Sequence, residues 1–331
     1  MKAQEVVDGI DGICVIVCTY DDPIGLTSQC LDSLLCQEKI HEIIVVDSSK
    51  RDDIRKLCYS TNNRINGLIN NRKNNKDDKD KNKNNKDDKD KNKNKINYVY
   101  TPPKGLSDAR NKGMEISKND IIAFTDSDCI ADKNWAVNIC GSFSMLDSEK
   151  VAIVGGKVLP KWSLENPNKI LSNSAIAQGF YSLYDMGKEL KEVSQIFGGN
   201  FAINKRLING QIFLSQLGRG KENLLCGEEL DFCWRIRKNN LKVVYNPTMI
   251  IWHQIPEERI RLKWMWRRMY YSGITRAMIG GKPTPKTVDA SYNFYDIIFL
   301  TLFILPYLCG IFNGIFNGIF KIQFKQIFRL Q

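Results

Sequence analysis

Two carboxylates stand directly after what reads as a buried strand. In NDIIAFTDSDCIADKNW, the mostly apolar residues 121–125 run straight into Asp126 and Asp128. An ionised carboxylate is costly to remove from water unless something pairs with it, so this pair either lies at an exposed strand end or holds a cation. The D-x-D spacing alone is uninformative, because it recurs at 78–80 and 88–90 in a stretch without apolar residues. The apolar strand before Asp126 is what favours a site.

Polar residues also end two other apolar runs. GICVIVCTYDD brings Thr19 and Asp21 to the end of a predicted strand, and HEIIVVDSS reaches Asp47 in the same way. In open α/β sheets, ligands bind at the carboxyl ends of the strands. Together with Asp126 and Asp128, these aspartates would repel one another unless cations or hydrogen-bond donors intervened. Hard divalent cations prefer carboxylate oxygens, so a divalent metal that bridges a diphosphate is the economical explanation.

The segments that must position these residues alternate between strand-like and helix-like patterns. In order they are strand, helix, strand, strand, helix and strand, at residues 12–20, 26–37, 41–49, 96–101, 105–117 and 120–126. Strands that are apolar without interruption are typical of a sheet covered on both faces. The predicted fold class is therefore α/β.

A low-complexity tract interrupts this pattern. Residues 70–95 hold the decamer NNKDDKDKNK twice in succession and no apolar residue. Such a tract cannot bury enough surface to offset chain entropy, so we predict a disordered insertion within a catalytic domain at 1–255. A nucleic-acid-binding arm is the alternative, but interspersed Asp and absent aromatics argue against it, and no nucleic-acid partner is predicted.

The cysteines and the N-terminus indicate the compartment. The ten cysteines form no C-x-x-C motif and several lie in apolar runs, which favours buried, reduced thiols over a disulfide or zinc framework. The first twelve residues, MKAQEVVDGIDG, lack the apolar core of a signal peptide. We therefore expect the main body in the cytoplasm.

Five sequence blocks resemble family 2 glycosyltransferases of the GT-A fold. They occur in family order across 13–253 and read VIVCTYDDPIGLTSQCLDSLLCQ, EIIVVDSS, GLSDARNKGMEISKNDIIAFTDSDC, GGNFAINK and GEELDFCWRIRKNNLKVVYNPTMIIWH. Five blocks in order are more specific than any one alone. The resemblance implies a Rossmann-like mixed sheet flanked by helices. It also implies inverting transfer of a sugar from a nucleotide-diphosphate donor, usually with Mg²⁺ or Mn²⁺.

The same resemblance assigns donor-binding roles to the strand-end residues. Thr19 and Asp21 would line the nucleotide pocket, and Asp47 would accept a hydrogen bond from the base. Asp126 would meet the ribose, and Asp128 would hold the metal. Relatives often have Asn in place of one aspartate of TYDD and a second Asp after VVD, so these positions depart from the family pattern.

Arg110, in SDARNKG, would face the diphosphate by the same resemblance. An Arg near a helix start suits phosphate through its planar fork and through the helix N-terminus. The alternative is a solvated helix charge.

The segment CGEELDFCWR offers three candidates for the proton acceptor of the reaction. An acceptor hydroxyl must lose its proton as it attacks. The family usually has Glu-Asp where this chain has Glu228-Glu229, and its base aligns with the second residue. We predict Glu229 as the base, with Glu228 as the alternative and Asp231 in the acceptor site. Acidic residues in a first helical turn also favour the macrodipole, which explains one of the three.

Two further motifs each have two readings. His253, at the end of VVYNPTMIIWH, would complete the metal shell in several relatives, while a lone His at a strand end also serves as a structural hydrogen-bonding group. In FGGNFA, Gly198, Gly199 and Asn200 either let the acceptor approach the backbone closely or form a tight turn.

The C-terminal part changes character. Residues 256–290 contain RIRLKWMWRRMYYSGITRAM, a mixture of Arg and aromatic residues that favours an interfacial helix on anionic lipid. In the region 291–331, residues 297–320 carry no charge, which predicts a membrane segment followed by a basic tail. Gly310, Gly314 and Gly318 have the spacing of close helix packing and of possible oligomerisation. Positive charge on both sides leaves open whether the segment spans or dips.

These observations predict a metal-dependent glycosyltransferase on the cytoplasmic face of a membrane. Its acceptor would be a glycan or glycolipid in surface polysaccharide or glycolipid biosynthesis. One alternative is a polyprenyl-phosphate glycosyltransferase, and another is an inactive membrane-bound assembly subunit, which the Glu228-Glu229 departure alone suggests.

Overall fold

The computed structural model describes residues 10–74, 96–146, 149–163, 169–220, 222–280 and 293–327. The strands are β1 (Ile13–Thr19), β2 (Ile40–Asp47), β3 (Ile96–Tyr100), β4 (Ile121–Asp126), β5 (Cys129–Ala131), β6 (Val151–Trp162), β7 (Lys191–Glu192), β8 (Phe201–Asn204) and β9 (Lys242–Ile255). The helices are α1 (Ile24–Leu35), α2 (Asp53–Asn74), α3 (Leu106–Ile116), α4 (Trp135–Met145), α5 (Lys169–Asn173), α6 (Ala175–Phe180), α7 (Glu228–Lys238), α8 (Glu257–Ile260), α9 (Leu262–Ile279) and α10 (Phe294–Ile327).

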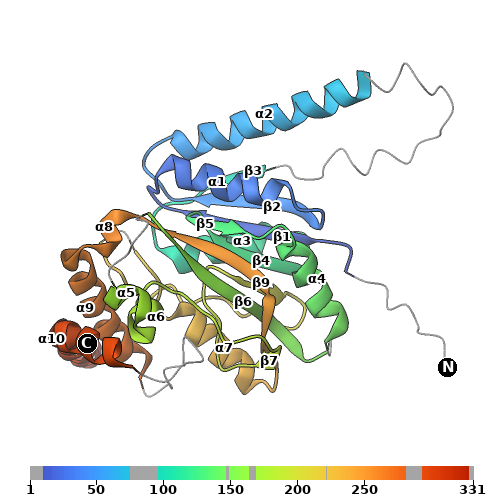
Figure 1. The fold of residues 1–331 in the computed structure, drawn as a ribbon. Helices are drawn as coiled ribbons and strands as arrows, with labels where there is room; N and C mark the ends of the chain where they lie inside the picture. The colour runs from blue at the N-terminus through green and yellow to red at the C-terminus, as the bar shows by residue number, and fades with distance from the viewer. Residues whose placement is uncertain are drawn as a thin grey trace.

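The strands form one mixed sheet in the order β3-β2-β1-β4-β8-β6-β9-β5, with β7 paired to β9 (Figure 1). The first half is parallel, because β1 pairs in parallel with β2 and β4, and β2 with β3. Antiparallel pairing begins where β4 meets β8, and β5 pairs antiparallel with β9. The predicted α/β class, with a mixed sheet and flanking helices, is confirmed.

Helix α2 differs from the sequence prediction, which placed two strands in succession here. Parallel strands need a crossover connection, and α2 supplies it between β2 and β3. The predicted insertion at 70–95 also begins too early, since residues 70–74 are the last residues of α2. Residues 75–95 lie outside the described residues, so the prediction of disorder there stays a prediction.

Helices cover both faces of the sheet, which explains its uninterrupted apolar strands. The odd-numbered side chains of β1, from Ile13 to Val17, belong to one buried cluster with side chains of α1 and α4. The even-numbered ones, from Cys14 to Cys18, belong to a second cluster with side chains of α3 and α7. Each buried aliphatic side chain stabilises the fold by roughly 1.5–3 kcal/mol relative to exposure. All ten cysteines are free and seven are buried, the exceptions being Cys36, Cys226 and Cys309.

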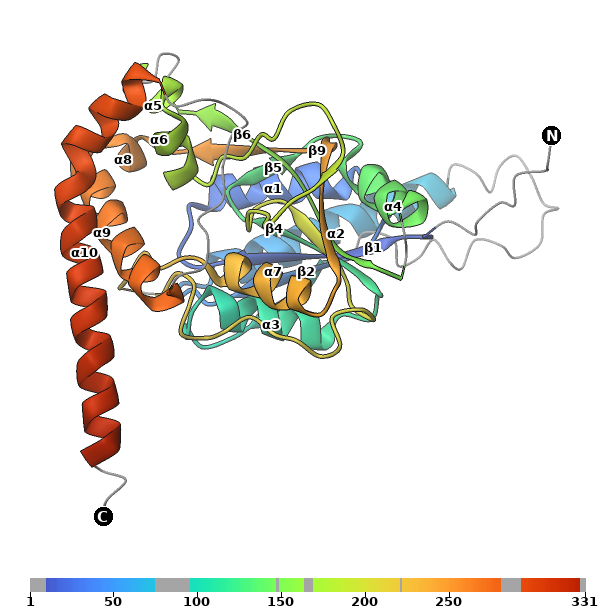
Figure 2. The ribbon, with the colours of Figure 1, turned by 90° about the horizontal axis from the view of Figure 1, so that it is seen from below.

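Helices α9 and α10 lie side by side along one edge of the molecule, and α10 continues past the body (Figure 2). They approach closely because a Cβ at Gly310 would overlap the Tyr270 carbonyl, and one at Gly314 would crowd Ala277 of α9. The predicted close-packing role of these two glycines is met within the chain, between α9 and α10, and their use in oligomerisation stays a prediction. The surroundings of Gly318 are not among the described contacts.

The first 23 residues of α10, Phe294–Phe316, are long and apolar enough to cross a membrane, and most of them are exposed. Asp296 nevertheless ties the start of α10 to the body. Its carboxylate accepts hydrogen bonds from the Ser174 hydroxyl at 2.8 Å and the Ile176 amide at 3.0 Å. Helix α9 is also more than an interfacial helix, because Met265 and Met269 are buried against protein.

Candidate active site

A cavity of about 770 Å³ opens at the carboxyl ends of β1 and β4. Strand β1 has β2 on one side and β4 on the other, so the connections that leave these strand ends diverge and leave a crevice. Thr19 from β1 and Asp126 from β4 line it, as predicted from their positions. The opposite walls come from α3, α6, α7, α9 and α10.

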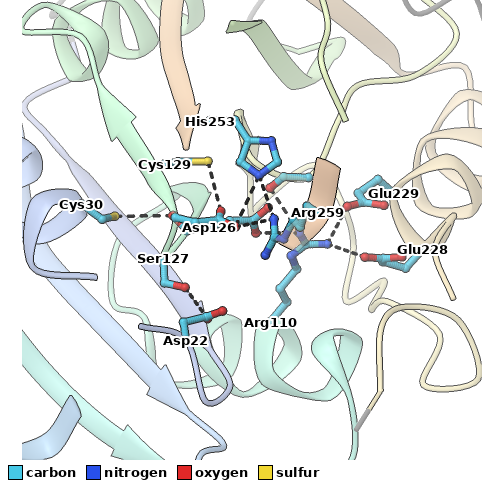
Figure 3. A network of polar contacts seen from close by, with 12 residues as sticks. Asp22, Cys30, Arg110, Asp126, Ser127, Cys129, Glu228, Glu229, His253 and Arg259 are labelled. Atoms are coloured by element: carbon cyan, nitrogen blue, oxygen red, sulfur yellow. Dashed lines mark hydrogen bonds and ion pairs between the residues drawn. The ribbon is translucent and has the colours of Figure 1, made fainter. Parts of the chain in front are cut away.

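One group of side chains surrounds the carboxylate of Asp128. Arg259 places Nη1 2.8 Å from Asp128 Oδ2 and 3.2 Å from His253 Nε2. His253 Nε2 lies 3.4 Å from the same Asp128 oxygen, and all three side chains line the cavity. Figure 3 shows Arg259 between His253 and the strand end that carries Asp126. We call Asp128, His253 and Arg259 the Asp128 group.

The tautomer of His253 follows from its other nitrogen. Nδ1 lies 2.9 Å from the carbonyl oxygen of Tyr181, which can only accept, so Nδ1 carries a proton. In the neutral ring, Nε2 is then an acceptor that faces an acceptor oxygen of Asp128. Two such acceptors repel each other unless a cation lies beside both, and the Arg259 guanidinium takes that place. A carbonyl that orients the ring in this way is typical of a metal-ligating histidine.

The charges of this group keep Asp128 ionised. Although burial opposes ionisation, His253 and Arg259 hold the pKa of the Asp128 carboxyl well below its usual range. Asp126, Asp128 and Cys129 each offer one ligand atom, and these atoms lie within 4.8 Å of one another. Burial raises the pKa of the Cys129 thiol well above its usual value. A protonated thiol is a poor ligand for a hard cation, so the oxygens and His253 Nε2 fit Mg²⁺ or Mn²⁺ better.

A second group joins Arg110 of α3 to the start of α7. Arg110 Nη1 donates to Glu229 Oε1 at 2.9 Å and Glu228 Oε1 at 3.0 Å, and Nη2 lies 3.5 Å from Asp126 Oδ1. The Arg110 side chain is 2% exposed, so the alternative of a solvated helix charge is wrong. We call Arg110, Glu228 and Glu229 the Glu228 group (Figure 3). Contact of Arg110 with a diphosphate stays a prediction.

The two glutamates of this group differ in exposure. Glu228 is 2% exposed, and its Oε2 has no hydrogen-bond partner among the described residues. Burial and the neighbouring Glu229 raise the pKa of Glu228 to about 8. Glu229 keeps 15% of its side chain exposed. The chain approaches Glu229 closely at Gly198, where a Cβ would overlap the Glu229 and Arg110 side chains.

The FGGNFA motif forms the tight turn that was one of its two readings. Asn200 donates its backbone N–H to the Phe197 carbonyl. Gly199 lines the cavity, whereas the Asn200 side chain is fully buried and bonded to Trp135, Lys157 and Met249. The predicted acceptor contact of Asn200 therefore does not fit its position.

Three predicted aspartates do not line the cavity. Asp231 is buried and pairs with Arg235 Nε at 2.8 Å. Of the three acidic residues, it is the one whose role is to stabilise the first turn of α7. Asp47 is fully buried and accepts hydrogen bonds from the Ser49 amide and the Tyr98 hydroxyl. Asp21 lies beside Arg51, with its amide donating to Ser49 Oγ.

The cavity instead contains residues that the sequence prediction missed. Asp22 replaces Asp21: its carboxylate accepts from Ser127 Oγ at 2.6 Å and from Thr19 Oγ1 at 3.2 Å. The backbone of Asp21 has φ = 52°, which turns Asp22 inward. Spacing from Thr19 to the third following residue, typical of local side-chain turns, could have pointed to Asp22. Arg259 was read as part of the basic region after His253.

Comparisons with known proteins support the resemblance. The sequence model of Glycosyl transferase family 2 matches residues 73–208. The glucosyl-dolichyl phosphate glucuronosyltransferase of Haloferax volcanii is 23% identical over 188 residues, which are 53% of this chain and 56% of that protein. The pre-mycofactocin glycosyltransferase of Mycobacterium tuberculosis is 25% identical over 171 residues, 51% of this chain and 34% of that protein. The chain thus spans about half or less of these curated relatives.

Among solved structures, the mannosyltransferase PcManGT from Pyrobaculum calidifontis, in complex with GDP-Man and Mn²⁺, has a similar fold. The TM-score is 0.51 at 14% sequence identity, over 95% of this chain and 76% of that one. At this identity the likeness concerns the fold, and it agrees with the GT-A arrangement of the sheet.

Proposed function

Because this chain belongs to glycosyl transferase family 2, we propose that it transfers a sugar from a nucleotide-diphosphate donor to a hydroxyl of a glycan or glycolipid acceptor. The observation that carries the proposal is one cavity with the Asp128 group on one wall and the Glu228 group on another. A transferase needs both: a place for a cation beside the leaving diphosphate, and a carboxylate that can take a proton.

On the donor side, Asp128 and His253 Nε2 would hold Mg²⁺ or Mn²⁺, the cation in the related solved mannosyltransferase being Mn²⁺. The bound cation supplies charge neutralisation for the departing nucleoside diphosphate. Thr19 and Asp126, at adjacent strand ends, are placed to contact the nucleoside. Arg110, which already faces three carboxylates, would orient them more than it binds phosphate.

On the acceptor side, we assign Glu229 as the base. An acceptor oxygen attacks the anomeric carbon while the bond from that carbon to the diphosphate oxygen breaks. The electron pair leaves with the nucleoside diphosphate, and the hydroxyl proton moves to Glu229. Attack opposite the leaving group inverts the anomeric configuration. Glu229 suits this role better than Glu228, because its side chain is more accessible from the cavity.

The membrane role is proposed for the outer face of α10. That face carries exposed Leu, Ile and Phe side chains along successive turns, and an exposed apolar stripe of this kind is typical of a membrane or protein contact. The inner face packs on α9 up to Gly314, so lipid cannot surround this stretch. We therefore favour a helix that dips into the interface, with the catalytic body on the cytoplasmic side where nucleotide sugars are supplied.

A screen of nucleotide sugars with Mn²⁺ tests the proposal. We expect at least one nucleotide sugar to release its nucleoside diphosphate. Without an acceptor this release is hydrolysis of the donor, and it should be slow. No release from any donor, with folded protein, would favour the inactive assembly subunit. The second enzymatic candidate, transfer to a polyprenyl phosphate, draws support from the apolar cavity wall at α10 and from the dolichyl phosphate in the name of the Haloferax volcanii relative.

A further inference from the structure

The guanidinium of Arg259 lies between the two atoms that the proposed function assigns to the metal. Its Nη1 is 2.8 Å from Asp128 Oδ2 and 3.2 Å from His253 Nε2 (Figure 3). A cation such as Mg²⁺ bonds its oxygen ligands at about 2.1 Å, so it needs the space directly beside both atoms. The guanidinium fills that space. Arg259 and a divalent metal therefore cannot hold the same oxygen and the same nitrogen together.

Charge repulsion adds to this steric conflict. Although desolvation opposes the charge of Arg259, the carboxylates of Asp128 and Asp22 raise the pKa of its guanidinium above the usual value. Arg259 is thus a full positive charge inside the cavity. A divalent cation at the same place would be repelled by it, more strongly than in bulk water. The guanidinium has to move away before Asp128 and His253 can bind a metal.

The side chain of Arg259 can move while its backbone stays in place. Arg259 belongs to α8, a helix of four residues, none of which is buried. The Tyr181 hydroxyl donates to the Arg259 carbonyl at 3.0 Å, and the Tyr181 carbonyl lies 2.9 Å from His253 Nδ1. Tyr181 is itself buried and stacked on Trp264. One fixed residue therefore holds both the Arg259 backbone and the His253 ring, and the rotatable bonds of the arginine side chain are the part that moves.

A diphosphate is the group that suits a displaced Arg259. The arginine lines the donor cavity, and its planar fork forms strong bidentate hydrogen bonds with phosphate oxygens. A diphosphate can therefore replace Asp128 as the anionic partner of Arg259. Arg110 is less suited to this exchange, because Glu228 and Glu229 already accept its hydrogen bonds at 3.0 and 2.9 Å.

We propose that Arg259 is a resident cation that competes with a divalent metal for Asp128 and His253 until the diphosphate of the donor draws its guanidinium away. This inference rests on the proposed function, which it deepens by making metal binding and donor binding depend on each other at that site. Such coupling is reciprocal: the diphosphate strengthens metal binding by the same factor as the metal strengthens diphosphate binding. Arg259 acts as a positioning residue in this exchange.

Mn²⁺ binding without nucleotide tests the competition. The full-length protein in detergent micelles is titrated with Mn²⁺, and free Mn²⁺ is followed by electron paramagnetic resonance. Arg259→Gln should bind Mn²⁺ at least about tenfold more tightly than wild type, because the two ligand atoms no longer have a competing cation. Unchanged or weaker Mn²⁺ binding in this variant would overturn the proposal.

Pyrophosphate binding in the presence of EDTA tests the contact with the diphosphate. Arg259→Gln should bind pyrophosphate about tenfold more weakly than wild type, the loss of one charge-assisted contact. The two affinities then change in opposite directions, whereas a merely structural role of Arg259 would weaken both. Pyrophosphate affinity within about twofold of wild type would overturn the release by diphosphate.

Arg259→Lys keeps the test available if Arg259→Gln does not fold. This variant retains a cation beside Asp128 but loses the planar fork. Its Mn²⁺ affinity should stay within about threefold of wild type, while its pyrophosphate affinity falls about tenfold. A tenfold gain of Mn²⁺ affinity in Arg259→Lys would show that the cationic charge does not compete with the metal.

Arg261→Gln is the matched control. Arg261 lies two residues further along the chain, is exposed and pairs with Glu257 at 3.2 Å on the surface. Its loss should leave both affinities within about twofold of wild type. Donor hydrolysis by wild-type protein is measured in parallel. Its absence would contradict the proposed function, while the opposite changes in Mn²⁺ and pyrophosphate affinity would still decide the role of Arg259.

Discussion

The Asp128 group and the Glu228 group contain the same kinds of side chain in one cavity, yet they stabilise opposite protonation states. Asp128 has the His253 ring and the Arg259 guanidinium beside it, and its pKa lies well below the usual range. Glu228 shares a single Arg110 with Glu229, and burial with this acidic neighbour raises its pKa to about 8. The ratio of cations to carboxylates, more than burial itself, separates the two.

This difference indicates a division of labour. A carboxylate that stays ionised at every physiological pH can hold a metal, because it never needs to release a proton first. A glutamate pair with one shared cation and one raised pKa can exchange a proton near neutral pH. Pairs of titratable groups whose surroundings drive their pKa values apart are typical of active sites. Each prediction below disturbs one side of this contrast.

The largest effect is expected from Asp128→Asn, which removes the permanent anion. Within the described residues, no second carboxylate takes the place of Asp128 between His253 and Arg259. Donor transfer with Mn²⁺ should fall on the order of 10⁴-fold, as several kcal/mol of charge stabilisation are lost. Mn²⁺ binding in the presence of nucleoside diphosphate, followed by electron paramagnetic resonance, should be lost in parallel.

Asp120→Asn is the control for this variant. Asp120 immediately precedes β4 but pairs with Arg206 on the surface, so transfer and Mn²⁺ binding should stay at wild-type levels. Retained Mn²⁺-dependent turnover in Asp128→Asn would show that the cation is held elsewhere.

The next largest effect is expected from Glu229→Gln on the other side of the contrast. This change keeps size and polarity but removes the base, so turnover should fall about 10²–10⁴-fold. Donor affinity should change much less, since Glu229 pairs with Arg110, which is not a member of the Asp128 group. Comparing donor binding and turnover in Glu229→Gln and Glu228→Gln locates the base. A larger turnover loss in Glu228→Gln would move the role to Glu228.

The parallel half of the sheet and the strand-end location of the site could be predicted from sequence, because they depend on local patterns. Uninterrupted apolar runs such as residues 121–125 indicate buried strands, and the strand ends then converge by topology. Thr19, Asp126 and Asp128 were located correctly for this reason. The crossover helix α2 was not predicted, because it lies in a polar segment where the helical periodicity of apolar residues is weak.

The residues that were misplaced depend on tertiary contacts or on one backbone angle. The left-handed conformation at Asp21, with φ = 52°, exchanges Asp21 for Asp22 in the cavity. The sequence indicates a polar loop residue at Asn200, but its side chain accepts a hydrogen bond from Trp135 of α4, which is distant in the sequence. Arg259 and Arg268 enter the site only because the chain after β9 folds back over the strand ends. No local sequence pattern indicates that the chain folds back in this way.

The raised pKa of Glu228 predicts a pH-dependent stability. Its folded pKa of about 8 exceeds the usual 4.5, so between these values the folded state binds a proton that the unfolded state lacks. The free energy of unfolding should therefore fall as pH rises through this window, by at most about 1.4 kcal/mol per pH unit. Glu228→Gln mimics the protonated side chain and should lose this slope.

Denaturant unfolding of wild type and Glu228→Gln near pH 5 and pH 8 measures the difference. The variant should gain stability relative to wild type at the higher pH. The same stability difference at both pH values would mean that Glu228 is ionised in the fold across this range, and the contrast with Asp128 would disappear.

The smallest effect is expected from Cys129→Ala, which asks whether the Asp128 group uses sulfur. Cys129 is within ligand distance of Asp126 and Asp128, but burial raises the pKa of its thiol, and Mn²⁺ prefers oxygen and imidazole nitrogen to a neutral thiol. The Mn²⁺ dissociation constant should therefore change less than about twofold. The free energy of unfolding should fall by about 1 kcal/mol, because the variant loses packing contacts of the buried sulfur. Cys140→Ala, a buried free cysteine of α4 outside the cavity, controls for the packing term. Two outcomes would make the thiol a ligand: a tenfold loss of Mn²⁺ affinity in Cys129→Ala alone, or the loss of tight Cd²⁺ binding in that variant. The Asp128 group would then hold its metal through oxygen, nitrogen and sulfur together.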